Sequence, residues 1–455
     1  MEDKLYCGAS KVNITPSAEL LPWMFGLMDR HYCKVHDELF VRVMAFQAGE
    51  TKALIVVYDL DKATNPEEWT KRIEEETGVP ADNILYLAIH THTAPLTGYR
   101  PFEGSNFIGC KAPEVQEKVK EYETFLLERL LEAVEMALQN LASARFGYAR
   151  GTCDVGVNRC VRYDVSQEDG TVGPMMGLGY NADGIADRTL LALRVENAET
   201  GAPIGFFINY AVHCVAAFLN DCGDGKSFLS GDIGGAVSRA LEEEYPGSVA
   251  LWTSAPAGDI NPVQMIQTFH PDRITGAPVE RCIKGEDAAD ATISAMAGRQ
   301  LSSIRETLRR VECTIDIAEV RTKIDWAKTK CSRSGIKADD QDCDEDYIIR
   351  THLLQIGPLA LIGVDGELYT SHGQTMKSAS PVPDTFIINH DGSLLEDNPG
   401  YIADDATIEL MKACGGRGGI PGGRVYTAPG TVKAALEEST KRLFMTTDDQ
   451  KCAGS

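Results

Sequence analysis

The segment Asn83-Ile-Leu-Tyr-Leu-Ala-Ile-His90-Thr91-His92-Thr93 joins an apolar run to a polar end, and it points to both the fold and the chemistry of the chain. An unbroken apolar run of this kind predicts a strand buried on both faces, as occurs where helices cover a sheet. Sheets of α/β proteins bind their ligands at the carboxyl ends of the strands. The position of His90 and His92 therefore indicates a functional site at the end of this strand.

Short apolar runs alternate with longer amphipathic ones along the rest of the chain, which is the pattern of an α/β protein. Besides Asn83–Ile89, strands are predicted at Phe40–Gln47, Ala53–Asp59, Leu190–Val195, Ile204–Val212, Val249–Thr253 and Leu359–Val364. Helices are predicted at Asn65–Thr77, Pro113–Gln139, Gly231–Tyr245, Asp287–Arg309 and Thr431–Phe444. We expect a central mixed β-sheet flanked by helices.

No internal repeat, low-complexity tract or Pro/Ser-rich linker divides the sequence, so we expect one catalytic domain over residues 1–455. Loops that are long for a compact domain usually cover or form a site. Long loops are expected at Cys153–Arg188, Asp221–Leu229, Asn261–Ala277 and Gly415–Gly423.

The net charge is strongly negative, at −23 from 44 Lys and Arg residues against 67 Asp and Glu residues. Such a surface repels phosphate backbones and anionic lipids, so we expect no nucleic-acid partner and no stable membrane association. A small molecule is the expected substrate. The composition leaves the oligomeric state open.

The start of the sequence, Met1-Glu-Asp-Lys-Leu-Tyr6, lacks the basic and apolar blocks of a secretion signal, so a cytoplasmic location is expected. The most apolar stretch, Ile204 to Leu219, is shorter than the roughly 20 apolar residues of a membrane helix. The 13 cysteines are odd in number and include no Cys-x-x-Cys pair, which argues against a disulfide framework.

His90 and His92 have the spacing that places two side chains on one face of a strand. Two imidazoles on one face can reach a single Zn²⁺ at about 2.0–2.1 Å. His213 follows the apolar run Ile204–Val212 and would complete the three protein ligands typical of catalytic zinc. The alternatives are strand-end histidines bound to loops and, for His213, a hydrogen-bonded core histidine. The remaining histidines show no ligand spacing; they are His31, His36, His270, His352, His372 and His390.

Other catalytic motifs are absent or incomplete. Gly225-Lys226-Ser227 ends like a phosphate-binding loop, but Asn220 occupies the place of its first glycine, which argues against ATP binding. Neither the Gly-x-Ser-x-Gly elbow of serine hydrolases nor the His-Glu-x-x-His helix of zinc proteases occurs. The glycine-rich segment from Gly415 to Gly423 follows a predicted helix, so it is read as a surface loop or lid and not as a dinucleotide-binding loop.

From Gly8 to about Leu443 the sequence resembles the catalytic domain of the neutral/alkaline, non-lysosomal ceramidase family. The shared order of several short segments carries this resemblance. They are Gly8-Ala-Ser-Lys-Val-Asn-Ile-Thr-Pro16, Val35-His-Asp-Glu-Leu-Phe-Val-Arg42, His90-Thr-His-Thr-Ala-Pro95, Asn158-Arg159, His213, Ser230-Gly-Asp232, Gly258-Asp-Ile-Asn-Pro262, Gly366-Glu367, Gly400-Tyr-Ile402 and Ala428-Pro-Gly430.

The resemblance implies a zinc site with a specific set of ligands, which fall on His90, His92, His213, Glu367 and Tyr401. By the spacing of the sequence alone, Glu367 could equally be a solvated turn carboxylate, and Tyr401 an ordinary loop aromatic.

The resemblance also implies two residues that act on the substrate. Arg159 matches the family's Asn-Arg pair and would orient a carbonyl or stabilise an oxyanion. Asp259 lies beside the position of the family's active-site serine and would act as general base or orient a partner. Their alternatives are an ion-paired arginine and a turn aspartate.

Two departures from the family limit which of its properties can be expected of this chain. Asn261 stands where ceramidases carry the serine, and the sequence ends at Ser455, before the β-sandwich domain that ceramidases append. We therefore expect a zinc-dependent amidohydrolase that cleaves an amide, lactam or ester of a small soluble substrate with zinc-activated water. The alternatives are a ceramidase or other N-acyl lipid amidase and a metal-binding protein without catalysis.

Overall fold

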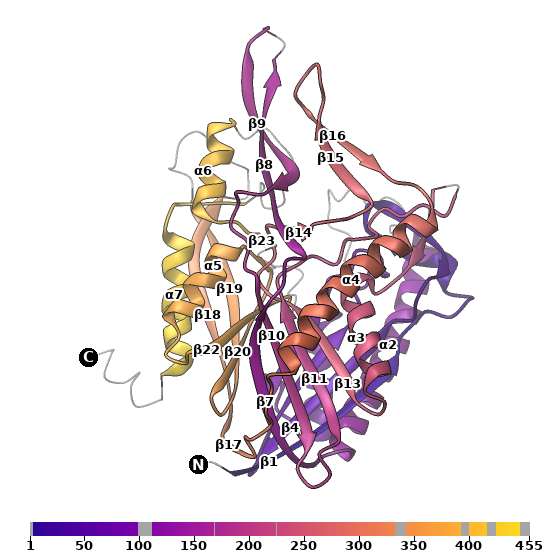
Figure 1. The fold of residues 1–455 in the computed structure, drawn as a ribbon, viewed down its shortest axis with the longest axis vertical. Coiled ribbons are helices and arrows are strands. Elements are labelled where there is room, and N and C mark those ends of the chain that lie inside the picture. Colours follow the sequence, from indigo (N-terminus) through magenta and orange to yellow (C-terminus); the bar gives the residue numbers. More distant parts are fainter. Residues whose placement is uncertain are drawn as a thin grey trace.

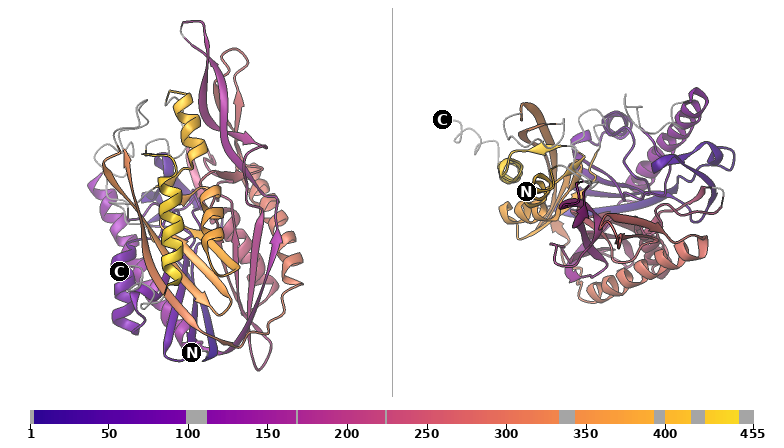
Figure 2. Two further views of the ribbon diagram at one scale, coloured as in Figure 1. Left: turned by 90° about the vertical axis from the view of Figure 1, so that its left-hand side faces the viewer. Right: turned by 90° about the horizontal axis from the view of Figure 1, so that it is seen from above.

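The computed structural model describes residues 3–98, 112–167, 169–223, 225–332, 343–392, 400–415 and 425–445. Two β-sheets pack face to face, and helices cover their outer faces (Figures 1 and 2). The predicted class, an α/β protein with a central mixed sheet flanked by helices, is confirmed. Its organisation as a single domain stays a prediction.

The larger sheet consists, in spatial order, of β13 (Val249–Ser254), β11 (Pro203–Tyr210), β10 (Thr189–Asn197), β7 (Ala142–Thr152), β1 (Asp3–Asn13), β4 (Phe40–Ala48), β5 (Thr51–Tyr58) and β6 (Ile84–Ala88). β17 (Ile317–Ala318) also pairs with β1. The pairs β11–β13 and β5–β6 are parallel, whereas the pairs between them along the sheet are antiparallel.

The smaller sheet has the order β22 (Asp384–Asn389), β20 (Leu359–Val364), β19 (Glu345–Ile356), β18 (Val320–Ser332) and β24 (Tyr426–Thr427). β20 and β22 are parallel. Of these five strands only β20 was predicted from the sequence, whereas β18, β19, β22 and β24 were not. β18 is only partly buried and rich in Lys, Arg and Thr, so its apolar periodicity is weak.

Burial on both faces explains why most strands of the larger sheet read as continuous apolar runs. β1 and β7 are only partly buried and were not predicted. Val41 and Val43 of β4 lie in the core beneath α1 and α2, whereas Met44 and Phe46 face the opposite side. The core on that opposite side also contains Phe386 of β22, which joins the two sheets.

The helices surround these sheets. α1 (Pro66–Thr77) and α2 (Pro113–Gln139) cover the half of the larger sheet that contains β4, and α3 (Asp232–Glu244) and α4 (Glu286–Leu308) cover the half that contains β13. α5 (Thr370–Ala379) and α7 (Thr431–Phe444) cover the smaller sheet, and α6 (Asp405–Ala413) lies beyond α5 (Figure 1). Short 3₁₀ helices are η1 (Leu21–Trp23), η2 (Leu27–Asp29) and η3 (Ala81–Asn83).

Three of the predicted loops contain strands, because hairpins with one exposed face lack a strong apolar pattern. Residues 153–188 form β8 (Gly156–Ser166) and β9 (Val172–Asn181), which extend beyond the body of the protein (Figure 1). Residues 261–277 hold most of β14 (Ile260–Pro262) and β15 (Gln267–Pro271), and β15 pairs with β16 (Pro278–Cys282). Residues 221–229 end in β12 (Lys226–Leu229). The loop Gly415–Gly423 lies outside the described residues, apart from Gly415.

The remaining strands are short, namely β2 (Phe25–Gly26), β3 (Arg30–Val35), β21 (Glu367–Leu368) and β23 (Tyr401–Ile402). Cys7, Cys153, Cys160 and Cys214 are buried free thiols. Among the helices that the structure describes, none has the length and apolar character needed to cross a membrane.

Candidate metal centre

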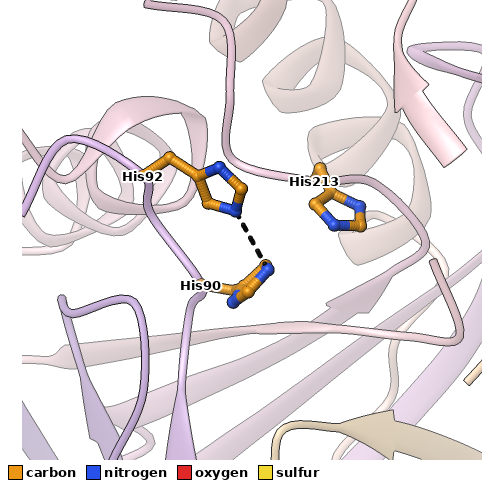
Figure 3. A group of neighbouring side chains, drawn as sticks. All are labelled: His90, His92 and His213. Carbon is orange, nitrogen blue, oxygen red and sulfur yellow. Dashed lines mark hydrogen bonds between the residues drawn. The ribbon is translucent and has the colours of Figure 1, made fainter. Parts of the chain in front are cut away.

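His90 and His92 lie in a tight turn after β6. The strand ends at Ala88, and His90 has a left-handed backbone conformation with a φ angle of 60°. Strand alternation was therefore the wrong reason for placing the two imidazoles together, because the chain leaves the strand before reaching them. The turn still makes the rings converge, and Nε2 of His90 lies 3.1 Å from Nε2 of His92 (Figure 3).

The threonines of the same motif hold this turn in place. The Oγ1 atoms of Thr91 and Thr93 both donate to the carbonyl oxygen of Ser230, at 3.0 and 2.8 Å. The backbone N–H of His92 donates to the carbonyl of Cys214 at 3.2 Å. This last bond joins the turn to the segment that carries His213.

His213 follows β11 and is buried. Its Nδ1 lies 3.0 Å from the carbonyl oxygen of Ile260, which can only accept a hydrogen bond. Nδ1 therefore carries the ring proton, and Nε2 keeps a lone pair. Nδ1 of His90 is held in the same way, 2.9 Å from the carbonyl oxygen of Asp61. One ring nitrogen from each of His90, His92 and His213 lies within 4.8 Å of the others, so these three residues could hold one metal ion.

Glu367 and Tyr401, which only the family resemblance indicated, lie in the same cluster. They are direct neighbours in the parallel pair β21–β23. Oε2 of Glu367 is 3.1 Å from Nε2 of His213 and 3.3 Å from Nε2 of His90. The hydroxyl of Tyr401 is 3.5 Å from Nε2 of His213.

The spacing of these atoms fits a single cation. Ligand atoms bound at about 2.0–2.1 Å in a tetrahedral arrangement lie about 3.3 Å apart. Three separations in the cluster, His90–His92, His90–Glu367 and His213–Glu367, are 3.1–3.3 Å, and the three histidine nitrogens lie within 4.8 Å of one another. Lone pairs that face one another at this distance repel unless a proton or a cation lies between them. A set of imidazole and carboxylate donors is suited to zinc.

The protonation states also suit metal binding. Burial lowers the pKa of His92 and lowers that of His213 to about 3, so both rings are neutral at neutral pH. Burial would raise the pKa of Glu367, but the nearby His90 outweighs it, and the net pKa is well below its usual value. Burial lowers the pKa of His90, whereas Glu367 and Asp61 raise it more strongly. Without a cation, the cluster therefore favours a proton on His90.

Two further residues support the cluster, and neither was predicted from the sequence. Oδ1 of Asp61 is 3.2 Å from Nδ1 of His90, and such a carboxylate behind a histidine fixes the ring's tautomer and orientation. Asp61 follows β5, the parallel neighbour of β6, so its position at a strand's carboxyl end was a usable signal. The ring of His390 stacks on that of His90, with centroids 4.0 Å apart, and no local spacing indicated this contact.

Arg159, on β8, also reaches the cluster and is buried. Its guanidinium donates to Oδ1 of Asn261 at 3.0 Å and to the carbonyl of Gly258 at 2.7 Å, and it lies 3.2 Å from Nε2 of His213. It also lies over the ring of Tyr401, with Cζ 5.4 Å from the ring centroid. The structure thus brings Arg159 and Asn261 together beside the histidines.

Asp259 lies next to this group but is bonded elsewhere. Its Oδ1 accepts hydrogen bonds from the backbone N–H and the hydroxyl of Thr370, both at 2.9 Å, at the start of α5. Its Oδ2 accepts from the side chain of Asn158 at 3.0 Å. Burial raises its pKa to about 7, although the bonds from Thr370 lower it. These contacts favour the orienting alternative for Asp259 over that of general base.

No protein-family model matches the chain, and no curated protein sequence matches it. Solved structures match in fold. The neutral ceramidase from Pseudomonas aeruginosa has a TM-score of 0.66 at 15% sequence identity, over 98% of this chain and 76% of that one. A ceramidase complexed with C2 has a TM-score of 0.65 at 14% identity, over 97% of this chain and 75% of its own. The expected resemblance therefore extends to three dimensions, and the chain has the neutral-ceramidase fold.

Proposed function

We propose that this chain is a zinc-dependent hydrolase that cleaves an amide, lactam or ester bond of a small soluble substrate. The observation that carries the proposal is the convergence of Glu367 with three histidines that could hold one metal ion, since three of the separations between their ligand atoms are 3.1–3.3 Å. When bound, zinc lowers the pKa of water to about 7 and so supplies a nucleophile at neutral pH.

Asn261 is suited to bind the substrate's carbonyl oxygen or the oxyanion that develops from it. Arg159 donates to Oδ1 of Asn261, which turns the amide Nδ2 away from the guanidinium. Nδ2 lies 3.6 Å from the sulfur of Met265, a weak acceptor that leaves the N–H groups available. The nitrogen lone pair of a carboxamide is delocalised, so Asn261 does not serve as a nucleophile.

Arg159 and Asp259 have two different roles, stabilisation of charge and positioning. The guanidinium of Arg159 places a buried positive charge beside the cluster, where it stabilises negative charge that develops on the substrate. Asp259 fixes Asn158, the residue before Arg159, and also the start of α5. We assign Asp259 the role of a positioning residue for the arginine.

The second candidate is a ceramidase or another N-acyl lipid amidase. Its support is the fold shared with the neutral ceramidase from Pseudomonas aeruginosa. Asn261 stands at the position of the family's serine, which argues against a ceramidase. The same difference motivates a third hypothesis, a metal-binding protein without catalysis.

Metal analysis and turnover together test these candidates. Wild type should hold about one zinc and His92→Ala much less, whereas His270→Ala, which changes an exposed histidine on β15, should match wild type. Equal zinc in wild type and His92→Ala would refute the metal assignment.

Side-by-side assays would then compare ceramide in detergent with small amides, lactams and esters. Efficient cleavage of ceramide alone would favour the lipid amidase. Absence of metal-dependent turnover on every substrate would favour the hypothesis of a metal-binding protein without catalysis. Single turnover in ¹⁸O-labelled water, with mass spectrometry of the protein, would reveal any acyl group trapped on a side chain, which would exclude direct attack by water.

A further inference from the structure

The rings of His90 and His390 form a parallel stack within the cluster. Their centroids are 4.0 Å apart and their planes differ by 13°. Both residues have a left-handed backbone conformation, with φ angles of 60° and 65°. A residue other than glycine rarely adopts this conformation unless its surroundings impose it, and such residues gather at functional sites.

The backbone around His390 is bonded to the two elements that carry the candidate ligands. The N–H of His390 donates to the carbonyl of Gly366, the residue before Glu367, at 3.3 Å. Side-chain Oδ1 of the next residue, Asp391, accepts a hydrogen bond from the N–H of Tyr86 on β6 at 2.9 Å, and the N–H of Gly392 donates to the carbonyl of Tyr86 at 2.7 Å. The segment 390–392 therefore joins the smaller sheet to β6 next to His90.

The stack supplies a restraint that the hydrogen bond of His90 does not. The torsion that sets the plane of a histidine ring has a broad energy minimum, so the contacts of Nδ1 with Asp61, which hold one edge of the ring, still allow some tilt. The face of His390 limits this tilt and thereby fixes the direction of Nε2 of His90.

The same geometry excludes His390 as a ligand of the same ion. A metal would be held by the Nε2 lone pair of His90, which points outward in the plane of that ring. Because the two rings are stacked and nearly parallel, this position lies off the plane of His390, where its nitrogen lone pairs do not point.

We propose that His390 is a positioning residue that orients the imidazole of His90 for metal binding. The inference rests on the proposed function only in requiring a metal at the histidine cluster. It does not depend on which bond is hydrolysed, or on whether any is.

Two substitutions test the proposal through metal affinity. His390→Asn tolerates the left-handed backbone but removes the ring, and His390→Phe keeps a flat ring without nitrogen atoms. Zn²⁺ affinity would be measured by competition with a chelator, and the geometry of the site by the visible absorption of bound Co²⁺. We expect affinity to fall about 10–100-fold in His390→Asn, as for other residues that orient a ligand, and to recover in His390→Phe.

Wild-type affinity and an unchanged Co²⁺ spectrum in His390→Asn would overturn the proposal. Equal losses in both variants would also overturn it, because a nitrogen atom and not the ring face would then matter. Thermal unfolding of the metal-free variants checks that both are folded. If wild type binds zinc through His90 but hydrolyses nothing, the proposed function fails and the role of His390 stands. If wild type binds no metal, both fail.

Discussion

Gly258 lies against the backbone of the turn that carries Glu367, and there is no room for a side chain. A Cβ atom at this position would lie 2.4 Å from the carbonyl oxygen of Glu367 and 2.7 Å from the ring of Tyr369. Ordinary contacts begin near 3.4 Å, so Gly258→Ala must move the two segments about 1 Å apart. The N–H of Gly258 also donates to the carbonyl of Leu368 at 3.0 Å, which resists the movement.

Two effects of known size should follow from Gly258→Ala. Overpacking of a close contact costs about 1–3 kcal/mol of unfolding free energy. A displacement of about 1 Å at a catalytic group lowers the rate about 100-fold, and zinc affinity should fall with it because Glu367 moves. Urea denaturation, chelator competition and turnover measure the three quantities.

Gly298→Ala is the matched control for this substitution. Gly298 lies within α4, and its Cβ atom would meet no atom within 4 Å. It should leave zinc affinity unchanged and stabilise the helix by up to about 1 kcal/mol. If Gly258→Ala keeps wild-type zinc affinity and stability, the close approach of Gly258 does not position Glu367, and the reasoning is refuted.

Three further predictions concern oxyanion binding, pH dependence and buried charge. Asn261→Ala should remove about 3–4 kcal/mol of transition-state stabilisation, which lowers kcat, and should leave zinc bound. A normal kcat would remove Asn261 from the site. Asp259, whose pKa burial raises from 3.8 to about 7, keeps a proton in the folded state that the unfolded chain has released. The stability of the metal-free protein should therefore fall as pH rises from about 4 to 7, and urea titrations should show a smaller fall for Asp259→Asn; equal slopes would contradict this. Arg42→Ala removes the ion-pair partner of buried Asp59 and one of the two partners of buried Glu242, which keeps Lys11, and should cost about 3–5 kcal/mol. The exposed, ion-paired Arg72→Ala should cost less than about 1 kcal/mol, and equal losses in denaturation would argue against the buried network.

Much of the fold and part of the candidate site could be predicted from local sequence. α2 and α7 begin and end at the predicted residues, because long amphipathic runs have clear boundaries. Partly exposed strands such as β8 and β9 were read as loops, because they lack a continuous apolar run. His90, His92 and His213 were selected because each follows a buried strand, where polar residues are conspicuous.

By itself, then, the sequence determined which strands are buried and which histidines stand at their ends, since both properties depend on residues close together in the chain. Tertiary structure decided which strand ends meet. His213 and Glu367 are 154 residues apart and touch only because the two sheets pack face to face. The stack of His390 on His90 and the orientation of the Asn261 amide by Arg159 have the same origin. Local periodicity specifies how each strand is buried but carries no information on its distant neighbours, which the packing of the whole core selects.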